Sequence, residues 1–249
     1  MCGIAGFATG RPGSPEASEA VADAMAQALA HRGPDAHCVH AEPDGRLAFG
    51  HRRLAIVDLS AAGLQPMASA DGRWLVCYNG EIYNHTALRA PLLQEGVAFR
   101  GHSDTEVMLE WIARWGLDAF LEAAEGMFAS ARWDRRAGGL SRVRDRVGIK
   151  PLYWTLEGDR LGFGSELKAL RALPGFVPRI DRAAASAMLR FGAVPAPGCI
   201  LSGVAMLPPG HVLDWRPGEK PTLRPYWSAE ATLRASAAAP LGGDDDALI

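Results

Sequence analysis

Cys2 follows the initiator methionine, so removal of Met1 would leave this cysteine at the N-terminus. Its thiol would then share a residue with a free α-amine. An amine of pKa about 7.7–8.0 beside a thiol of about 8.5 forms a nucleophile–base pair near neutral pH. A second interpretation is a buried, inert thiol, since free cysteine is among the most buried residue types. Cys2 alone favours the inert thiol, so the rest of the sequence has to decide.

Other polar residues match the remaining groups of a small amide substrate. Asn79 and Gly80 supply a side-chain amide and a backbone N–H at a predicted turn, and both donors can converge on a developing oxyanion. Arg53 can bind a carboxylate with two parallel hydrogen bonds. Glu81 and Asp104 are acidic and can receive an ammonium group. A carboxylate, an ammonium and a cleavable amide together describe glutamine.

Each of these residues also has a purely structural interpretation. Asn79-Gly80 between two strands is the strongest short signal for a hairpin turn. Arg53 ends the basic run 51–53 and is compatible with a solvated surface. Asp104 is compatible with an acid that favours the first turn of a helix. Taken one at a time the residues favour structure, and only their combination points to a site.

Composition describes an ordinary globular protein of one large or two small domains. The chain has 249 residues, of which 48% are hydrophobic, and a formal net charge of −2. No basic excess suggests nucleic acid, and no run of about 18 apolar residues suggests a membrane span. The apolar start 2–8 lacks a basic flank and is too short for a signal peptide, which predicts a cytoplasmic protein.

The cysteines and histidines are scattered along the chain. Cys2, Cys38, Cys77 and Cys199 form no CxxC pair, which favours reduced thiols and argues against disulfides and a structural zinc site. No two of the seven histidines have the helical spacing of metal ligands, so we expect no metal.

The elements that must position these residues indicate an α+β layered domain. Ser14 is a predicted N-cap, Ser103 with Glu106 is a capping box, and Gly116 is a predicted C-cap. Strands cluster after helices and several are linked as hairpins, which argues against a parallel sheet. Helices are expected from Pro15 to a stop at Gly33-Pro34, and over 84–95 (with Pro91 inside), 104–115, 118–124 and 181–190. Strands are expected over 2–8, 37–41, 46–51, 73–78, 127–133, 140–144, 151–156, 160–164 and 211–215.

Ordered motifs along nearly the whole chain resemble the class II glutamine amidotransferase family. Within that family the chain is most similar to the N-terminal glutaminase domain of glutamine-hydrolysing asparagine synthetases. The motifs are 2–6 (CGIAG), 31–35 (HRGPD), 51–58 (HRRLAIVD), 79–84 (NGEIYN), 103–106 (SDTE), 126–129 (GMFA), 144–153 (RDRVGIKPLY), 164–170 (GSELKAL) and 207–210 (LPPG).

The resemblance implies an N-terminal-nucleophile hydrolase fold, an αββα sandwich with two stacked antiparallel sheets between helical layers. It also implies that Cys2 forms a γ-glutamyl thioester and that Asn79 and the Gly80 N–H form the oxyanion hole. Arg53 would bind the substrate α-carboxylate. The remaining implied contacts with glutamine come from the backbone segment Leu54, Ala55, Ile56 and Val57 and, for the α-amino group, from Glu81 and Asp104.

The resemblance also suggests roles outside the substrate contacts. His31, Arg32 and Asp35 are interpreted as scaffold. Segments 144–146 and 148–153 are expected to support the fold and face a partner domain, and we hypothesise that Lys150 helps to form an ammonia exit.

The expected domain organisation is an amidotransferase domain over 2–215, with its core to about residue 170, followed by 216–249. The second segment is interpreted as a linker, small-residue-rich over 235–243, and the start of a missing ATP-dependent synthetase domain, with a helix cap at 244–246. No Ser-Gly-Gly pyrophosphate loop is present. The chain is therefore expected to hydrolyse glutamine without making asparagine and to need no cofactor, because ATP and Mg would serve only the missing domain. Expected partners are glutamine and a C-terminal or separate synthetase domain, with a homodimer left open.

Three alternatives remain at this point. Other class II amidotransferases, which feed phosphoribosyl or sugar-phosphate acceptors, share the Cys2 chemistry. Enzymes of the synthetase branch that amidate an acceptor other than aspartate, as in secondary metabolism, share the motifs as well. A catalytically silent interaction domain could keep the fold, although a scaffold has no need of Cys2, Arg53, Asn79 and Asp104 together.

Overall fold

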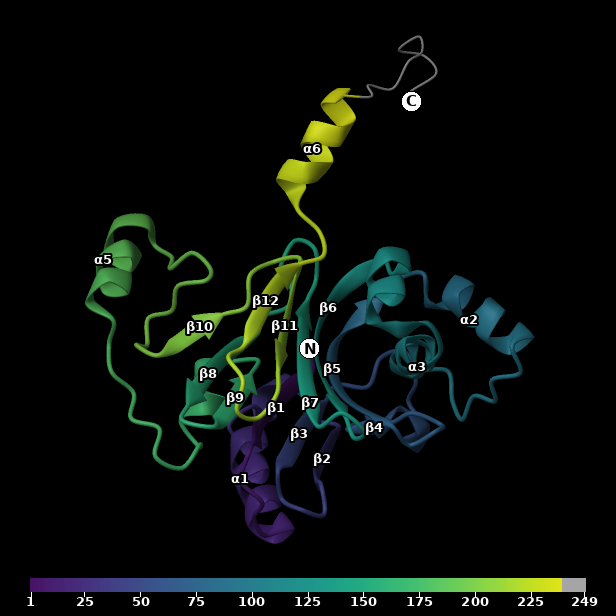
Figure 1. Cartoon of the computed structure of the whole chain (residues 1–249), viewed down its shortest axis with the longest axis horizontal. Coiled ribbons are helices and arrows are strands. Elements are labelled where there is room, and N and C mark those ends of the chain that lie inside the picture. The colour runs from purple at the N-terminus through teal and green to yellow at the C-terminus, as the bar shows by residue number, and fades with distance from the viewer. Residues whose placement is uncertain (239–249) are drawn as a thin grey trace.

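Two stacked antiparallel sheets of six strands each form the centre of the molecule in the computed structural model, which describes residues 1–238 (Figure 1). Every ladder between neighbouring strands is antiparallel, as the α+β prediction requires. The first sheet has the order β10 (Val204–Met206), β8 (Tyr153–Glu157), β9 (Arg160–Gly164), β1 (Gly3–Thr9), β3 (Leu47–Arg53) and β2 (Ala36–Ala41). The second has the order β12 (Thr222–Pro225), β11 (His211–Trp215), β7 (Gly139–Arg144), β6 (Gly126–Asp134), β5 (Trp74–Ile82) and β4 (Met67–Ala68).

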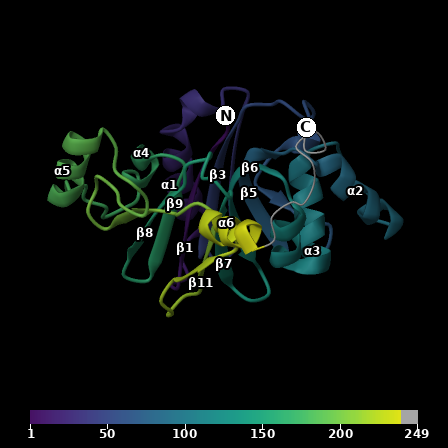
Figure 2. The ribbon, with the colours of Figure 1, turned by 90° about the horizontal axis from the view of Figure 1, so that it is seen from above.

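Helices cover the outer faces of both sheets, which completes the expected αββα sandwich (Figure 2). Helix α1 (Pro15–Gln27) and the short α4 (Leu167–Leu170) lie on the first sheet, and α2 (His85–Gln94) and α3 (Asp104–Ala123) lie on the second. Helix α5 (Arg182–Phe191) lies beyond the β10 edge, and α6 (Ala229–Ala238) projects from the body of the molecule (Figure 1).

Strand alternation divides the hydrophobic core into three layers, because successive side chains point to opposite faces of a sheet. On β1, Ile4 and Ala8 pack between the two sheets, whereas Ala5 and Phe7 pack under α1. On β5, Leu75 and Cys77 face the first sheet, and Trp74, Val76 and Tyr78 face α2 and α3. The same alternation directs Asn79 toward the first sheet and Tyr78 toward α3.

The local signals for helix ends are mostly confirmed. Ser14 caps α1 by accepting a hydrogen bond from Ala17 N, and Asp181 caps α5 in the same way. Ser103 caps α3, but the capping box is only half formed: the Glu106 carboxylate bonds to the backbone N–H groups of 100 and 101 and not to that of Ser103. The loop before α3 therefore uses the Glu106 carboxylate, which in a capping box would accept from the N–H of Ser103.

The prediction of a turn at Asn79-Gly80 is wrong. Strand β5 continues through both residues to Ile82, and they pair with Ala129 and Phe128 of β6. Gly80 is needed here for close packing, since a Cβ atom would lie 2.3 Å from the Met127 carbonyl oxygen.

Other boundaries differ in detail. The first helix ends at Gln27, and a short 3₁₀ turn over Ala30–Arg32 fills the rest of the predicted span. Gly116 has a φ of 89° and breaks α3 without ending it, so the two predicted helices form one interrupted element. Pro91 lies inside α2. Strands β4, β10 and β12, the 3₁₀ turn at Ala61–Gly63 and helices α4 and α6 were not predicted. The predicted cap at 244–246 lies outside the described residues.

No helix within residues 1–238 has the length and apolar character needed to cross a lipid bilayer.

Arg142 on β7 gives a testable consequence for stability. Its side chain is fully buried, and none of its three guanidinium nitrogens has a hydrogen-bond partner within residues 1–238. Burial lowers the pKa of this guanidinium well below its ordinary value, and the ring of Trp154 lies 5.7 Å from it. Because an uncompensated buried cation is costly, Arg142→Met should raise the free energy of unfolding by about 1–4 kcal/mol in urea titrations. Replacing the exposed Arg234 by Met is the control, and a less stable Arg142→Met protein would contradict the expectation.

Candidate active site

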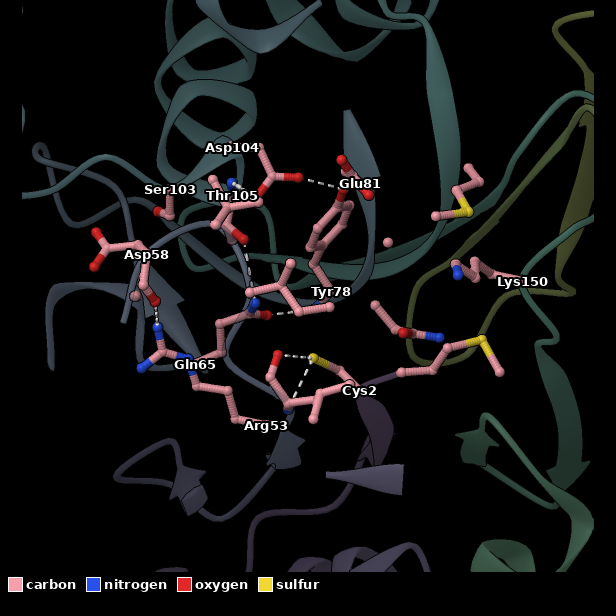
Figure 3. A pocket seen from close by; sticks show the side chains of 18 residues that line it. Cys2, Arg53, Asp58, Gln65, Tyr78, Glu81, Ser103, Asp104, Thr105 and Lys150 are labelled. Carbon is pink, nitrogen blue, oxygen red and sulfur yellow. Dashed lines mark hydrogen bonds between the residues drawn. The ribbon is translucent and has the colours of Figure 1, made fainter. Parts of the chain in front are cut away.

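The predicted site residues meet in one cavity of about 140 Å³ (Figure 3). This is smaller than the roughly 300–1,000 Å³ of sites for drug-sized ligands, and it suits a ligand the size of a single amino acid. The structure brings nearly all of the predicted residues together here, and Ala55 alone is not part of the cavity wall. The predicted residues that line it are Cys2, Arg53, Leu54, Ile56, Val57, Asn79, Gly80, Glu81 and Asp104.

Cys2 directly precedes β1 and is half-buried. Arg32 Nε donates a hydrogen bond to the Cys2 carbonyl oxygen at 2.9 Å, and Leu54 N lies 3.4 Å from the sulfur. Burial raises the pKa of the Cys2 thiol, and the Leu54 backbone contact and the positive charge of Arg53 oppose that shift only in part. The thiol is therefore mostly protonated at neutral pH and needs a base before it can act as a nucleophile.

Asn79 lines the cavity and carries an unpartnered hydrogen-bond donor. Its side chain is 1% exposed, and its Nδ2 has no hydrogen-bond partner within the described part of the chain. A buried polar group without a partner is costly, so its position against the cavity suits a ligand oxygen that would complete the bond.

Arg53 ends β3 and is buried, which excludes the solvated-surface interpretation. Its Nη1 donates to the Ser60 carbonyl oxygen at 2.8 Å, and its Nη2 donates to the carbonyl oxygen of Asp58. These bonds hold the planar guanidinium in one orientation. Within residues 1–238 its side chain makes no other hydrogen bond, so its remaining N–H groups can bind a ligand.

Asp58 organises the loop that holds Arg53, a role that was not predicted from the sequence. Its carboxylate accepts hydrogen bonds from Ser60 N at 2.8 Å, Ser60 Oγ at 2.6 Å and His102 N at 2.8 Å. These bonds, with that of the Ser60 side chain contributing most, lower the pKa of Asp58 to about 2. The sequence signal was the Asp-Leu-Ser spacing, because an aspartate commonly accepts from the backbone two residues on.

Asp104 opens α3 and is 5% exposed. Its Oδ2 accepts hydrogen bonds from the Tyr78 hydroxyl at 2.8 Å and from Ile82 N at 3.0 Å, and its Oδ1 accepts from Thr105 N at 2.9 Å. These bonds orient the carboxylate in the cavity wall near Glu81 (Figure 3). Asp104 therefore does more than complement the dipole of the helix.

The 31–35 motif has a structural explanation at this site. Arg32 holds the backbone of Cys2, as described above, and Asp35 accepts a hydrogen bond from Ala55 N at 2.8 Å. Ala55 thus anchors the segment that follows β3, while Ile56 and Val57 lie at the rim with 66% and 38% of their surface exposed. These contacts agree with the interpretation of Arg32 and Asp35 as scaffold.

Two further lining residues were not among the predicted substrate contacts, although Lys150 belongs to the 144–153 motif. Gln65 joins the walls of the cavity, because its Oε1 accepts from Tyr78 N at 2.6 Å and its Nε2 donates to Thr105 Oγ1 at 3.2 Å. Lys150 is 5% exposed and lines the cavity, with its backbone N–H bound to Asp145 (Figure 3). Burial, and secondarily the charge of Arg32, lower the pKa of the Lys150 ammonium.

All four cysteines are free thiols, as predicted. A search of residues 1–238 finds no group of three His, Cys, Asp or Glu side chains placed to hold a metal ion.

The stacked sheets, with a cysteine at the start of β1 beside the cavity, define an N-terminal-nucleophile hydrolase fold. A solved B. subtilis glutamine phosphoribosylpyrophosphate amidotransferase, complexed with ADP and GMP, has the same fold with a TM-score of 0.66 and 20% identity; the match covers 90% of this chain and 49% of that one. The family model for the glutamine amidotransferase domain matches residues 1–227. The chain therefore belongs to the glutamine amidotransferase family.

Curated relatives of known name include asparagine synthetases within the glutamine amidotransferase family. The chain is 37% identical to asparagine synthetase [glutamine-hydrolyzing] 3 of Bacillus subtilis (strain 168), over 93% of this chain and 37% of the relative. It is 35% identical to asparagine synthetase 1 of the same organism, over 92% and 36%. It is also 34% identical to amidase chry2 of Gibberella zeae, over 92% and 35%. The chain spans little more than a third of the length of these relatives.

Proposed function

We propose that this chain hydrolyses glutamine to glutamate and ammonia through a thioester on Cys2. The observation that carries the proposal is the placement of the Cys2 thiol and the unpartnered Asn79 amide in one small cavity. That cavity also holds a fixed guanidinium and fixed carboxylate groups. The three chemical groups of glutamine thus have counterparts of matching charge or hydrogen-bonding type.

The proposed reaction begins when the α-amine of Cys2, exposed by removal of Met1, takes the proton of the thiol. The sulfur then attacks the amide carbon of glutamine, and the developing oxyanion accepts hydrogen bonds from Asn79 Nδ2 and the Gly80 N–H. Collapse of the tetrahedral intermediate breaks the C–N bond, and the proton on the α-amine passes to the leaving ammonia. Water then hydrolyses the thioester, which releases glutamate and restores the thiol.

The rest of the cavity would hold the substrate in place during both steps. Arg53 would bind the α-carboxylate, and Asp104 and Glu81 would bind the α-ammonium group. The backbone from Leu54 to Val57 would lie along the substrate. This binding holds the amide near the sulfur, so that attack is effectively intramolecular.

The experiment that tests the proposal is the measurement of glutamate and ammonia released from glutamine by the purified chain. Asparagine, whose side chain is one methylene shorter, serves as the control substrate. Release of both products in equal amounts from glutamine, and little from asparagine, is the expected result. A protein of verified N-terminus that releases neither product would contradict the proposal.

The similarity to asparagine synthetases supports a second, coarser proposal for the whole protein. Residues 2–215 would form its amidotransferase domain and 216–249 a linker toward an ATP-dependent domain that uses the ammonia to amidate aspartate. ATP and Mg would act only there, this chain would need no cofactor, and the protein would be cytoplasmic. An ammonia acceptor other than aspartate remains the alternative, because a relative of similar identity, chry2, is named as an amidase and not as an asparagine synthetase. The coding sequence beyond Ile249 tests this, since an open frame with a Ser-Gly-Gly loop is expected.

Blocking the N-terminus is expected to silence the enzyme. Because burial raises the pKa of the Cys2 thiol, loss of its own α-amine as base should lower kcat by about 10²–10⁴. The test is a cleavable extension placed before Cys2, with intact mass measured before and after cleavage. Cleavage that leaves Cys2 first should restore activity, and the same extension at the C-terminus is the control. Full activity of the uncleaved protein would show that another group is the base.

A further inference from the structure

We infer that Tyr78 is a positioning residue that orients the Asp104 carboxylate and thereby sets the preference of the site for a ligand with an α-ammonium group. The inference rests on the proposed function, because it deepens the recognition of glutamine at the same cavity.

The placement of Tyr78 follows from strand alternation. It lies beside Asn79 on β5 but points to the opposite face, toward α3, where Asp104 occupies the first helical position (Figure 3). Its side chain is 2% exposed, and its hydroxyl is 2.8 Å from Asp104 Oδ2. Neighbouring residues of one strand therefore serve different walls of the cavity.

Hydrogen bonding leaves Asp104 with limited capacity for a ligand. Oδ2 already accepts from the Tyr78 hydroxyl and from Ile82 N, which uses both of its lone pairs. Oδ1 accepts only from Thr105 N within the described residues, so one acceptor position remains on this oxygen. The Tyr78 bond thus determines which oxygen of the carboxylate is available to an ammonium group.

Tyr78 is itself held rigidly. Its backbone N–H donates to Gln65 Oε1 at 2.6 Å, and its carbonyl oxygen lies 3.2 Å from His51 Nε2. Burial and the negative charge of Asp104 raise the pKa of the Tyr78 hydroxyl well above its ordinary value, so that it remains a donor throughout the working pH range. Removing the hydroxyl would leave only the backbone N–H groups of Ile82 and Thr105 to orient the carboxylate, and it would free one acceptor position on Oδ2.

The test compares glutamine with glutaramate, which is glutamine without its α-amine, in the wild type and in Tyr78→Phe. For the variant we expect the KM for glutamine to rise about tenfold or more, with kcat changed less than about twofold, because a hydrogen bond to a charged group is lost. Both constants for glutaramate should change less than about twofold. Inhibition by glutamate and by glutarate gives the same comparison without turnover. In Tyr78→Phe, inhibition by glutamate should weaken, whereas inhibition by glutarate, which has no α-amine, should not change.

Two controls separate positioning from a general effect on structure. Tyr83→Phe, which removes the hydroxyl of a tyrosine that is 56% exposed, should leave all constants unchanged. In an Asp104→Asn background, Tyr78→Phe should add little further loss, because the two residues act through one contact. Thermal unfolding of each variant establishes that the fold is kept.

The outcomes are distinct. Equal losses for glutamine and glutaramate, an unchanged KM, or a lower KM for glutamine would each overturn the inference. Failure of the wild type to hydrolyse glutamine would instead overturn the proposed function, and that result is known before any variant is compared.

Discussion

Replacing Cys2 by alanine is expected to abolish glutamine hydrolysis, with a loss in kcat of about 10⁴ or more, and to leave the fold intact. The loss is large because no other nucleophile in the cavity can form the thioester. The fold should persist because the side chain is only half-buried and, within residues 1–238, its hydrogen bonds are with the Leu54 backbone alone. Product release and thermal unfolding, measured on the same preparation, check both parts.

Cys38→Ala is the matched control for this substitution. Cys38 is also a half-buried free thiol, but it lies on β2 outside the cavity. It should retain full activity. Equal release of ammonia from Cys2→Ala and the wild type would remove Cys2 from the mechanism, whereas release from neither protein would favour a silent interaction domain.

Asn79→Ala is expected to lower kcat by about 10²–10³ with little change in KM, because the donor acts on charge that develops only in the transition state. The same change should not destabilise the protein. Asn79 Nδ2 has no partner in the described structure, so its removal breaks no hydrogen bond. Steady-state kinetics and urea unfolding measure the two effects separately.

Asn84 lies in the same 79–84 motif and is the matched control, because the polar atoms of its side chain have hydrogen-bond partners. Its Nδ2 donates to the Ala123 carbonyl oxygen at 2.9 Å, and its Oδ1 accepts from Glu125 N at 3.0 Å. Asn84→Ala should therefore cost about 1–3 kcal/mol of stability and leave kcat nearly unchanged. If Asn79→Ala lost stability and kept its kcat as well, the Asn79 amide would have only a structural role.

Local signals predicted the parts of the fold that depend on near neighbours in sequence. Ser14 and Asp181 cap their helices because each accepts from an N–H three residues on. The turn predicted at Asn79-Gly80 failed because the partner strand β6 lies far along the chain, after two helices. A continuous ladder with β6 keeps both residues in a strand, and no local pattern can reveal that pairing.

The same distinction applies to the residues of the candidate site. Residue types and the family resemblance identified the groups that face the cavity, such as Arg53 and Asp104. The residues that orient them could not be predicted: Tyr78 reads as one more apolar strand residue, and Gln65 as part of a loop. Their roles depend on which strand face meets α3, which only the packed structure determines.

The stacking of the sheets makes catalysis depend on the thickness of the hydrophobic layer. Cys2 precedes β1 of one sheet, whereas Asn79 and Gly80 belong to β5 of the other, and buried side chains such as Phe49 and Phe163 fill the space between the sheets. The packing between the sheets thus sets the distance from the Cys2 sulfur to the proposed oxyanion donors on β5. A methylene gained or lost in this layer would move the Cys2 sulfur relative to Asn79 and Gly80. A core substitution far from the cavity would therefore change the rate of the proposed reaction.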